Sequence, residues 1–314
     1  MSTSPRSDWR PETADDQVEL PPDLATHLHA AVTAAPSLDC VGFFEHDDFV
    51  YGLNRLVADP TAAPGTDRWD SLRRLGVQLA VAWRDLDRGL QPMRTGRLIR
   101  TVVDAEGGAV FCETVRPGMH VIGAVSAVSV DDREAADAAI ASVVEHLRSA
   151  EKLPSQNHGS FADSGPPVAE AGSGEVLRAS GDSSLVDSLS TSIRLDGLHA
   201  LAFFARGEKL ADVDCFDSPG LASFHELATP AERRPLYSGL GQELAGLASQ
   251  LNQATSGALG GRLRRIVLDV QSGAVYYRRL PRQRYLVGVT LDQTRVGRAD
   301  HQMTDLADHL SAVA

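Results

Sequence analysis

Apolar positions recur along the chain with the spacing first of a helix and then of strands. Leu24, Leu28 and Val32 lie four residues apart, which predicts a helix with one buried face. The apolar run 41–45 predicts a strand, and the turn-forming residues 46–48 predict that this strand opens a hairpin. A second amphipathic helix follows. Its apolar stripe consists of Leu72, Leu75, Leu79, Trp83 and Leu86.

Three more strands and a closing helix complete this pattern. Segments 98–104, 109–115 and 120–128 are rich in apolar residues, and residues 106–108 between the first two suit a tight hairpin turn. Segment 133–149 returns to helical spacing. The predicted order is therefore helix, two strands, helix, three strands, helix, which is one small α/β module.

The second half of the chain repeats the first. The segment GRLIRTVVD at 96–104 corresponds to GRLRRIVLD at 261–269, an offset of 165 residues (261 − 96). The same offset holds without a gap from Gly76, matched by Gly241, to Gly123, matched by Gly288. It changes to 160 in the first hairpin and to 163 in the last helix, as expected where loops have diverged. The chain is thus two copies of one module.

The copies define the predicted domain organisation. The first copy covers 23–150 and the second covers 183–314, where Leu185, Leu189 and Ile193 repeat the stripe of the first helix. Residues 151–182 are rich in Ser, Gly, Pro and Ala and predict a flexible linker. Residues 1–22 have the same character, so we expect a disordered tail there.

Charge and composition narrow the class of function. The net charge of −12 argues against a general affinity for nucleic acid, because phosphate binding depends on clustered Lys and Arg. Residues 1–20 lack the apolar stretch of a signal peptide, and no apolar run reaches the roughly 20 residues of a membrane span. Three cysteines without metal-like spacing predict buried thiols. We therefore expect a cytoplasmic protein with no membrane span.

Motifs for catalysis are weak throughout the chain. The glycine-rich stretch 257–262 lacks the Lys-Ser/Thr of a phosphate loop and leads from a helix into a strand, so a helix-ending turn is the better interpretation. No His-Glu-x-x-His or Cys-x-x-Cys motif indicates a metal, and no serine lies in a nucleophile elbow. Asp104 and Asp269 recur, but each ends a strand, where Asp favours a turn. We predict no enzyme activity, no cofactor and no catalytic or metal-binding residue.

The strand triplet of the second copy, 261–269, 272–275 and 285–289, resembles that of actinobacterial proteins of the Roadblock / dynein light chain superfamily. The resemblance covers both copies. It implies a profilin-like or longin-like α/β fold for each, a five-stranded antiparallel sheet with helices on both faces. It also implies that two modules join through their third strands and that Ras-like GTPases dock on the second helices. An exposed strand edge invites such pairing.

These considerations predict two sets of functional residues. We expect the third strands to pair within one chain as a pseudo-dimer, through Leu98, Arg100, Val102, Leu263, Arg265 and Val267. We expect the second helices to contact a partner through Arg73, Arg74, Arg84, Arg88, Gln242 and Gln250.

Three functions follow, in decreasing order of support. The first is a non-enzymatic adaptor that binds proteins, above all a small Ras-like GTPase, as a monomeric pseudo-dimer or as a homodimer. The second is a profilin-like sensory or small-ligand-binding module, which an apolar pocket of a few hundred Å³ with convergent polar groups would favour. The third is an enzyme, for which neither copy offers a catalytic constellation.

Overall fold

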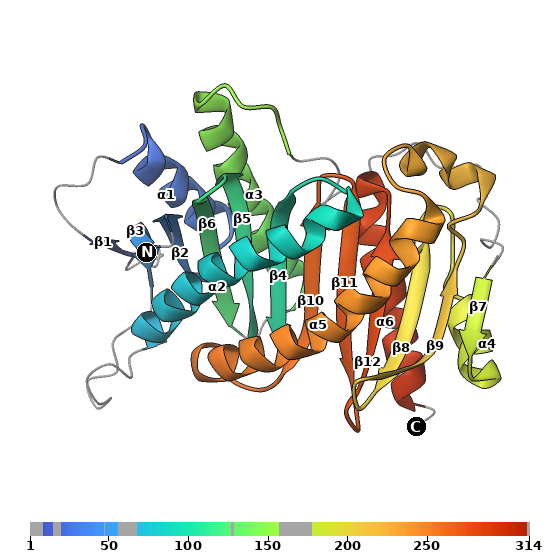
Figure 1. The fold of residues 1–314 in the computed structure, drawn as a ribbon. Helices are drawn as coiled ribbons and strands as arrows, with labels where there is room; N and C mark the ends of the chain where they lie inside the picture. The colour runs from blue at the N-terminus through green and yellow to red at the C-terminus, as the bar shows by residue number, and fades with distance from the viewer. Residues whose placement is uncertain are drawn as a thin grey trace. The chain divides into compact units, whose positions relative to one another are not determined.

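The structure is a computed structural model that describes residues 9–14, 20–46, 48–55, 68–126, 129–156 and 178–312. It is a mixed α/β protein built on antiparallel sheet (Figure 1). The elements of the first half are β1 (Arg10–Thr13), α1 (Leu24–Ala34), β2 (Leu38–Glu45), β3 (Asp48–Asn54), α2 (Arg68–Leu90), the 3-10 turn η1 (Gln91–Met93), β4 (Leu98–Ala105), β5 (Gly108–Arg116), β6 (Met119–Ser126) and α3 (Val130–Ala150).

The second half repeats this order of elements. They are β7 (Arg178–Gly181), α4 (Ser183–Ser190), β8 (Ala200–Ala205), β9 (Glu208–Asp214), η2 (Pro219–His225), α5 (Pro230–Ala258), β10 (Leu263–Val270), β11 (Gly273–Leu280), β12 (Arg284–Thr290), η3 (Gln293–Arg295) and α6 (Val296–Ala312). Helix, two strands, helix, three strands, helix is found in each half, as predicted.

The chain forms two compact units that do not follow the midpoint of the sequence. The first unit comprises residues 1–84, 104–155 and 253–262, and the second comprises 85–103, 156–252 and 263–314. Each unit therefore contains a short segment from the other half of the chain. In the first unit this segment is the end of α5 with its glycine turn; in the second it is the end of α2 together with most of β4.

The sheet of the first unit has the strand order β1-β3-β2-β6-β5, with antiparallel neighbours. α1 and α3 pack together, and α3 covers β5 and β6. The segment from the second half is tied in by backbone hydrogen bonds. The N–H of Glu106 donates to the carbonyl of Arg262 at 3.0 Å, and that of Gly107 donates to Gly260 at 3.1 Å.

The sheet of the second unit has the order β10-β11-β12-β8-β9-β7, again antiparallel, with residues 98–103 of β4 beside β10. Figure 1 shows α5 crossing one face of these strands and α6, which packs on β11 and β12, lying against the other. The segment from the first half is again held by its backbone. Gln271 N–H donates to the carbonyl of Arg97 at 3.0 Å, and Ser272 N–H donates to that of Thr95 at 2.8 Å.

One glycine in each copy sets how closely a helix approaches the sheet. A Cβ added to Gly76 of α2 would lie 2.4 Å from Cζ of Phe44, and one added to Gly241 of α5 would lie 2.6 Å from Cζ of Phe204. Both phenylalanines are buried. Since real Cβ atoms are not found at such distances, a side chain at either glycine would force the helix away from its strand.

Two short edge strands correct the expectation of disorder before each copy. Within the predicted tail, residues 10–13 form β1 and pair with β3; within the predicted linker, residues 178–181 form β7 and pair with β9. The sequence gives little signal for them, because both strands are exposed or nearly so and lack apolar alternation. Backbone pairing with an open sheet edge is enough to order them. Residues 1–8, 15–19 and 157–177 of these predicted segments lie outside the described residues.

The first helix of the second copy is shorter than its apolar spacing predicts. α4 ends at Ser190, and Ile193, the third residue of the predicted stripe, forms an isolated bridge with Leu198 instead. Both side chains are buried. The apolar spacing correctly predicted that Ile193 is buried, but not that it lies outside the helix. A residue in a buried turn can occupy the same place in the spacing as a residue on a helix face.

Candidate functional site

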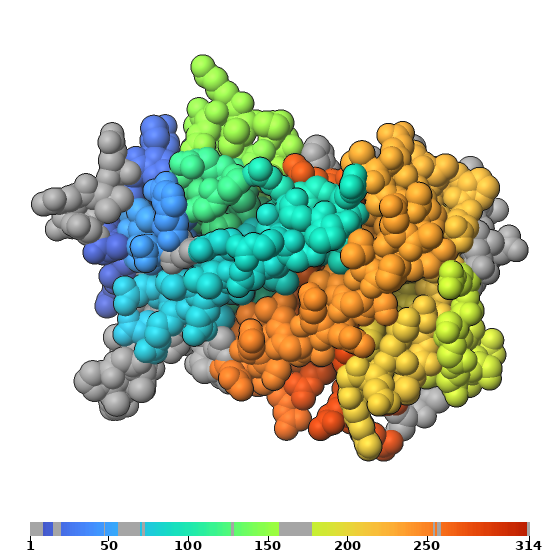
Figure 2. Space-filling model, in the orientation of Figure 1, coloured from blue at the N-terminus to red at the C-terminus, as the bar shows by residue number. Residues whose placement is uncertain are grey.

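The outer face of α2 carries the predicted arginine cluster. Arg73, Arg74, Arg84 and Arg88 are all exposed, and spacings of 11 and 4 residues bring the first, third and fourth to one side of the helix. Val81 between them is 46% exposed, unusual for a valine within a helix that buries an apolar stripe. In Figure 2 the outer surface of α2, coloured cyan, faces the viewer. The geometry suits a protein contact, and the role of these residues stays a prediction.

Ion pairs on this face are local and solvent-exposed. Arg73 lies 3.7 Å from Asp70, and Arg88 lies 3.0 Å from Asp85, each pair three residues apart on the helix. Such surface pairs stabilise a protein by no more than about 1 kcal/mol. The guanidinium groups can therefore exchange these carboxylates for those of a partner.

The equivalent face of α5 is polar but not cationic. Gln242 and Gln250 are exposed, as a contact with a partner requires. At the offset of 165 residues, Ser238, Ser249 and Gln253 stand where α2 has Arg73, Arg84 and Arg88. A partner that is attracted by positive charge would therefore distinguish α2 from α5.

The predicted interface residues are mostly buried. Leu98, Val102, Leu263 and Val267 are each at most 2% exposed, whereas Arg100 and Arg265 are half-buried. Residues 98–103 and β10 belong to the second unit, so the structure brings these two sets together there.

Two recurrent aspartates have a different role from the predicted turn. Asp269, fully buried in β10, accepts a hydrogen bond from Nη1 of Arg100 at 2.5 Å. Asp104, buried in β4, is bound by Nη1 of Arg133 at 2.9 and 3.0 Å to its two oxygens. The turn interpretation is wrong because both carboxylates point into the protein, where a buried charge requires a charged partner.

A buried arginine binds residues 85–103, the segment of the second unit that comes from the first half of the chain. Arg233 of α5 is 3% exposed, and its guanidinium donates to the carbonyls of Met93 at 2.8 Å, Phe224 at 2.9 Å and Ala228 at 3.2 Å. Met93 ends η1, which comes from the first half of the chain. The sequence offered no signal for this residue, since an arginine near a helix start normally faces solvent.

Two buried histidines are held in the neutral form. Burial lowers the pKa of His199 to about 4, against a weaker opposing effect of its hydrogen bond to the Leu195 carbonyl. Its Nδ1 accepts from Leu291 N–H at 2.9 Å, which assigns the proton to Nε2, 3.0 Å from that carbonyl. Burial and the charge of Arg84 lower the pKa of His120 to about 4. Both imidazole rings are almost wholly buried, with His120 3% and His199 0% exposed.

The cysteines are buried, as predicted, and burial raises the thiol pKa of two of them. Burial raises the pKa of the Cys112 thiol well above its usual value, and burial raises that of Cys215 to about 12. Cys40 is also buried. Since the thiolate is the reactive form, the raised pKa values keep Cys112 and Cys215 in the unreactive thiol form at neutral pH.

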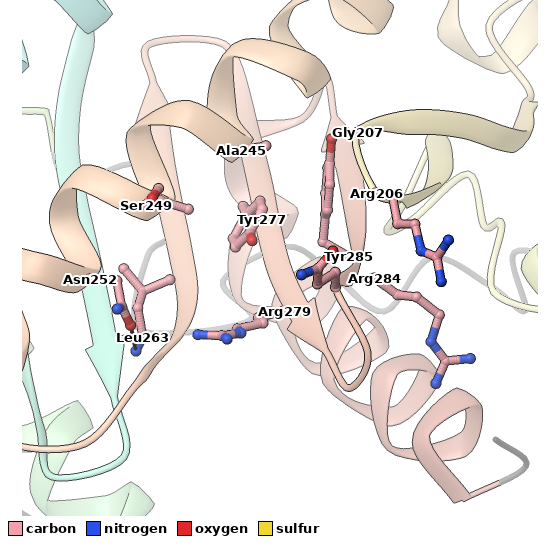
Figure 3. A pocket seen from close by; sticks show the side chains of 12 residues that line it. Arg206, Gly207, Ala245, Ser249, Asn252, Leu263, Tyr277, Arg279, Arg284 and Tyr285 are labelled. Carbon is pink, nitrogen blue, oxygen red and sulfur yellow. Dashed lines mark hydrogen bonds between the residues drawn. The ribbon is translucent and has the colours of Figure 1, made fainter.

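An open cavity of about 330 Å³ lies in the second unit (Figure 3). It is formed by the middle of α5, the start of β10, and the ends of β11, β12 and the β8–β9 hairpin. Arg206, Arg279 and Arg284 contribute to its wall together with the rings of Tyr277 and Tyr285. Sequence reasoning did not predict a site here, although the contrast between Trp83 and Ala248 was visible in the alignment of the two copies.

The described residues contain no cluster of three or more His, Cys, Asp or Glu side chains suited to hold a metal ion. Within the same ranges, no helix has both the length and the apolar character needed to cross a bilayer.

Comparisons with known proteins give partial matches to solved structures, two of which are described here. No protein-family model matches the sequence, and no curated protein does. The solved structure described as MglB with tetrameric arrangement matches 45% of this chain and 97% of its own, at 14% identity and a TM-score of 0.32. The crystal structure of MglC from Myxococcus xanthus matches 40% of this chain and 98% of its own, at 16% identity and a TM-score of 0.29.

Proposed function

We propose that the protein is a non-enzymatic cytoplasmic adaptor whose principal partner is a small Ras-like GTPase. The observation that carries this proposal is the order helix, two strands, helix, three strands, helix in both halves. That order is typical of the Roadblock / dynein light chain superfamily, which the strand triplet of the sequence resembles. In that family the second helices form the docking face, and the exposed arginines of α2 provide a charged surface for it here.

We propose further that the copies 23–150 and 183–314 pair through their third strands, so that one chain forms a pseudo-dimer. Several contacts support this. Arg100 of β4 binds Asp269 of β10, and the Arg97 carbonyl accepts from Gln271 N–H at 3.0 Å. A homodimer of such chains is the alternative arrangement.

The GTPase assignment is tested by calorimetric titration with the small GTPases of the same genome, each loaded with GDP or with a non-hydrolysable GTP analogue. We expect one nucleotide state to bind, and the double variant Arg73→Glu/Arg84→Glu to weaken binding at least about tenfold, because it reverses two charges in the contact. Arg282→Glu, an exposed arginine in the β11–β12 turn, is the matched control for charge reversal. Absence of binding in both nucleotide states overturns the GTPase assignment.

The pseudo-dimer is tested in the full chain by disulfide trapping. The variant Arg97→Cys/Gln271→Cys places two thiols where the backbone hydrogen bond joins the strands. We expect mild oxidation to remove both new thiols while the mass stays that of a single 33.5 kDa chain. Arg97→Cys/Arg282→Cys is the control. Oxidation only to a covalent dimer would favour the homodimer instead.

A second candidate function is a small-ligand-binding module, and the cavity of about 330 Å³ favours it. This volume lies in the range of small-molecule sites, and polar side chains line it from α5, from β11 and β12, and from the β8–β9 and β11–β12 turns. The two functions are compatible, because the cavity and the arginines of α2 belong to different elements.

A further inference from the structure

We propose that the cavity of the second copy binds a small planar organic carboxylate, and that the first copy has no equivalent site. The proposal rests on the second candidate function and assigns it a location and a ligand class. It stands on three observations: the charge of the cavity wall, the orphaned polar atoms within it, and the replacement of a tryptophan by an alanine.

Three guanidinium groups at the cavity face no carboxylate among the described residues. Arg206 and Arg279 are exposed, and their side chains take part in no ion pair there. Arg284 donates through Nε to the carbonyl of Pro281 at 3.0 Å. Figure 3 shows Arg279 on one side of the two tyrosines and Arg206 and Arg284 on the other, so positive charge lies at both ends of the cavity. In a protein of net charge −12, such a wall attracts anions locally. Guanidinium binds carboxylate through paired N–H groups, which gives both affinity and orientation.

Two polar atoms at the cavity are buried without a hydrogen-bond partner among the described residues. They are the hydroxyl of Tyr285, a residue 5% exposed, and Nη2 of Arg284. Leaving such a group unsatisfied is energetically costly, so buried polar groups normally have a partner. Both atoms are donors, and Figure 3 shows Tyr285 standing within the ring of lining residues. A bound anion would supply the missing acceptor.

The rings of the cavity wall suit a planar ligand. Tyr277 and Tyr285 lie 5.2 Å apart between ring centroids, and Tyr285 stacks on Phe204 at 4.7 Å with an interplanar angle of 4°. Ala248 and Leu263 add an apolar floor. The hydroxyl of Tyr277, like any phenol, is protonated at neutral pH and is a further donor at the wall. An apolar body with one anionic end matches this arrangement.

The first copy fills the same place with side chains. At the offset of 165 residues, Trp83 corresponds to Ala248 and His120 to Tyr285. Trp83 is 5% exposed, and its ring lies 5.2 Å from that of His120. Thr114 stands at the position of Arg279, and its hydroxyl shares a hydrogen bond of 3.2 Å with Nδ1 of His120. The indole thus occupies the volume that the alanine leaves open, and two of the guanidinium groups are absent, since Met119 stands at the position of Arg284.

The test is a calorimetric titration of the full chain with benzoate, indole-3-acetate and hexanoate, and with phenyl phosphate as the competing anion class. We expect at least one aromatic carboxylate to bind with a Kd below about 1 mM, more tightly than hexanoate or phenyl phosphate. Ala248→Trp fills the cavity as in the first copy, and should weaken binding at least tenfold. Arg279→Gln, at an exposed position, should weaken it several-fold, whereas Arg282→Gln, also exposed, should not.

Each outcome decides the proposal. No binding of any carboxylate by the unmodified protein overturns it, as does binding that is unchanged in both Ala248→Trp and Arg279→Gln. Preference for phenyl phosphate overturns the carboxylate assignment. The GTPase titration with Ala248→Trp separates the two functions: unchanged GTPase binding with lost benzoate binding shows that the cavity and the adaptor surface are independent.

Discussion

The two copies differ most where Trp83 stands in the first and Ala248 in the second. In the first copy the indole packs on His120, and the space between helix and sheet is filled. In the second copy the corresponding helix and strands are present, but two tyrosines and three arginines surround an open cavity. The same order of elements therefore supports either a packed interior or a potential site. Which one results depends on a few side chains rather than on the fold.

The largest effect is expected from truncating the tryptophan that fills the first copy. Trp83→Ala removes a buried indole, and such a change costs about 3–5 kcal/mol of the free energy of unfolding. Urea denaturation followed by circular dichroism measures this cost. The reverse change, Ala248→Trp, enters an existing cavity and should cost far less. Equal losses for the two variants would show that the cavity of the second copy is not open in solution.

The buried histidines predict a comparable loss of stability in acid. His120 and His199 each have a pKa of about 4 in the folded protein against 6.5 when unfolded, so only the unfolded chain gains these protons between those values. Stability is thus complete above pH 6.5 and falls as the pH drops toward 4, by up to about 3 kcal/mol per histidine.

Denaturant midpoints measured between pH 7 and pH 4 test this expectation. His199→Asn retains an acceptor for Leu291 N–H without a titrating ring, and should remove about half of the pH dependence. His301→Asn, on the exposed side of α6, is the matched control and should leave the profile unchanged. A profile that is the same in all three proteins contradicts the assignment.

The paired glycines offer an intermediate effect and a direct test of equivalence between the copies. Gly76→Ala and Gly241→Ala each place a methyl group against a buried phenylalanine ring. Overpacking of this kind costs about 1–3 kcal/mol. Gly246→Ala on α5, where nothing lies within 4 Å of the added Cβ, should be neutral or slightly stabilising because alanine favours helix. A loss in one copy only would show that the two helices do not approach their sheets alike.

The sequence predicted the fold better than it predicted the site. Local spacing and the offset of 165 residues were enough for the order of elements, because both report which face of each element is buried. The edge strands β1 and β7 were missed because backbone pairing carries no side-chain pattern. Arg233 and the pairing of Arg100 with the buried Asp269 were missed as well, although Arg100 was expected at the strand interface, since these contacts join segments far apart in the chain. To predict the cavity from the sequence, the difference between Trp83 and Ala248 has to be treated as a loss of side-chain volume that leaves space open in the second copy.

The smallest effect on stability is expected from changes to the arginines of α2. The size of this effect shows whether these side chains contribute to folding or are free to bind a partner. Arg88→Ala breaks the exposed pair with Asp85 and should change the free energy of unfolding by no more than about 0.5 kcal/mol. The same change in Arg233, whose buried guanidinium donates to three backbone carbonyls, should cost several times more, because it removes all three hydrogen bonds. Urea denaturation of both variants measures the difference. A large loss for Arg88→Ala would assign the α2 arginines to the folding of the protein and remove the physical basis for treating them as a contact surface.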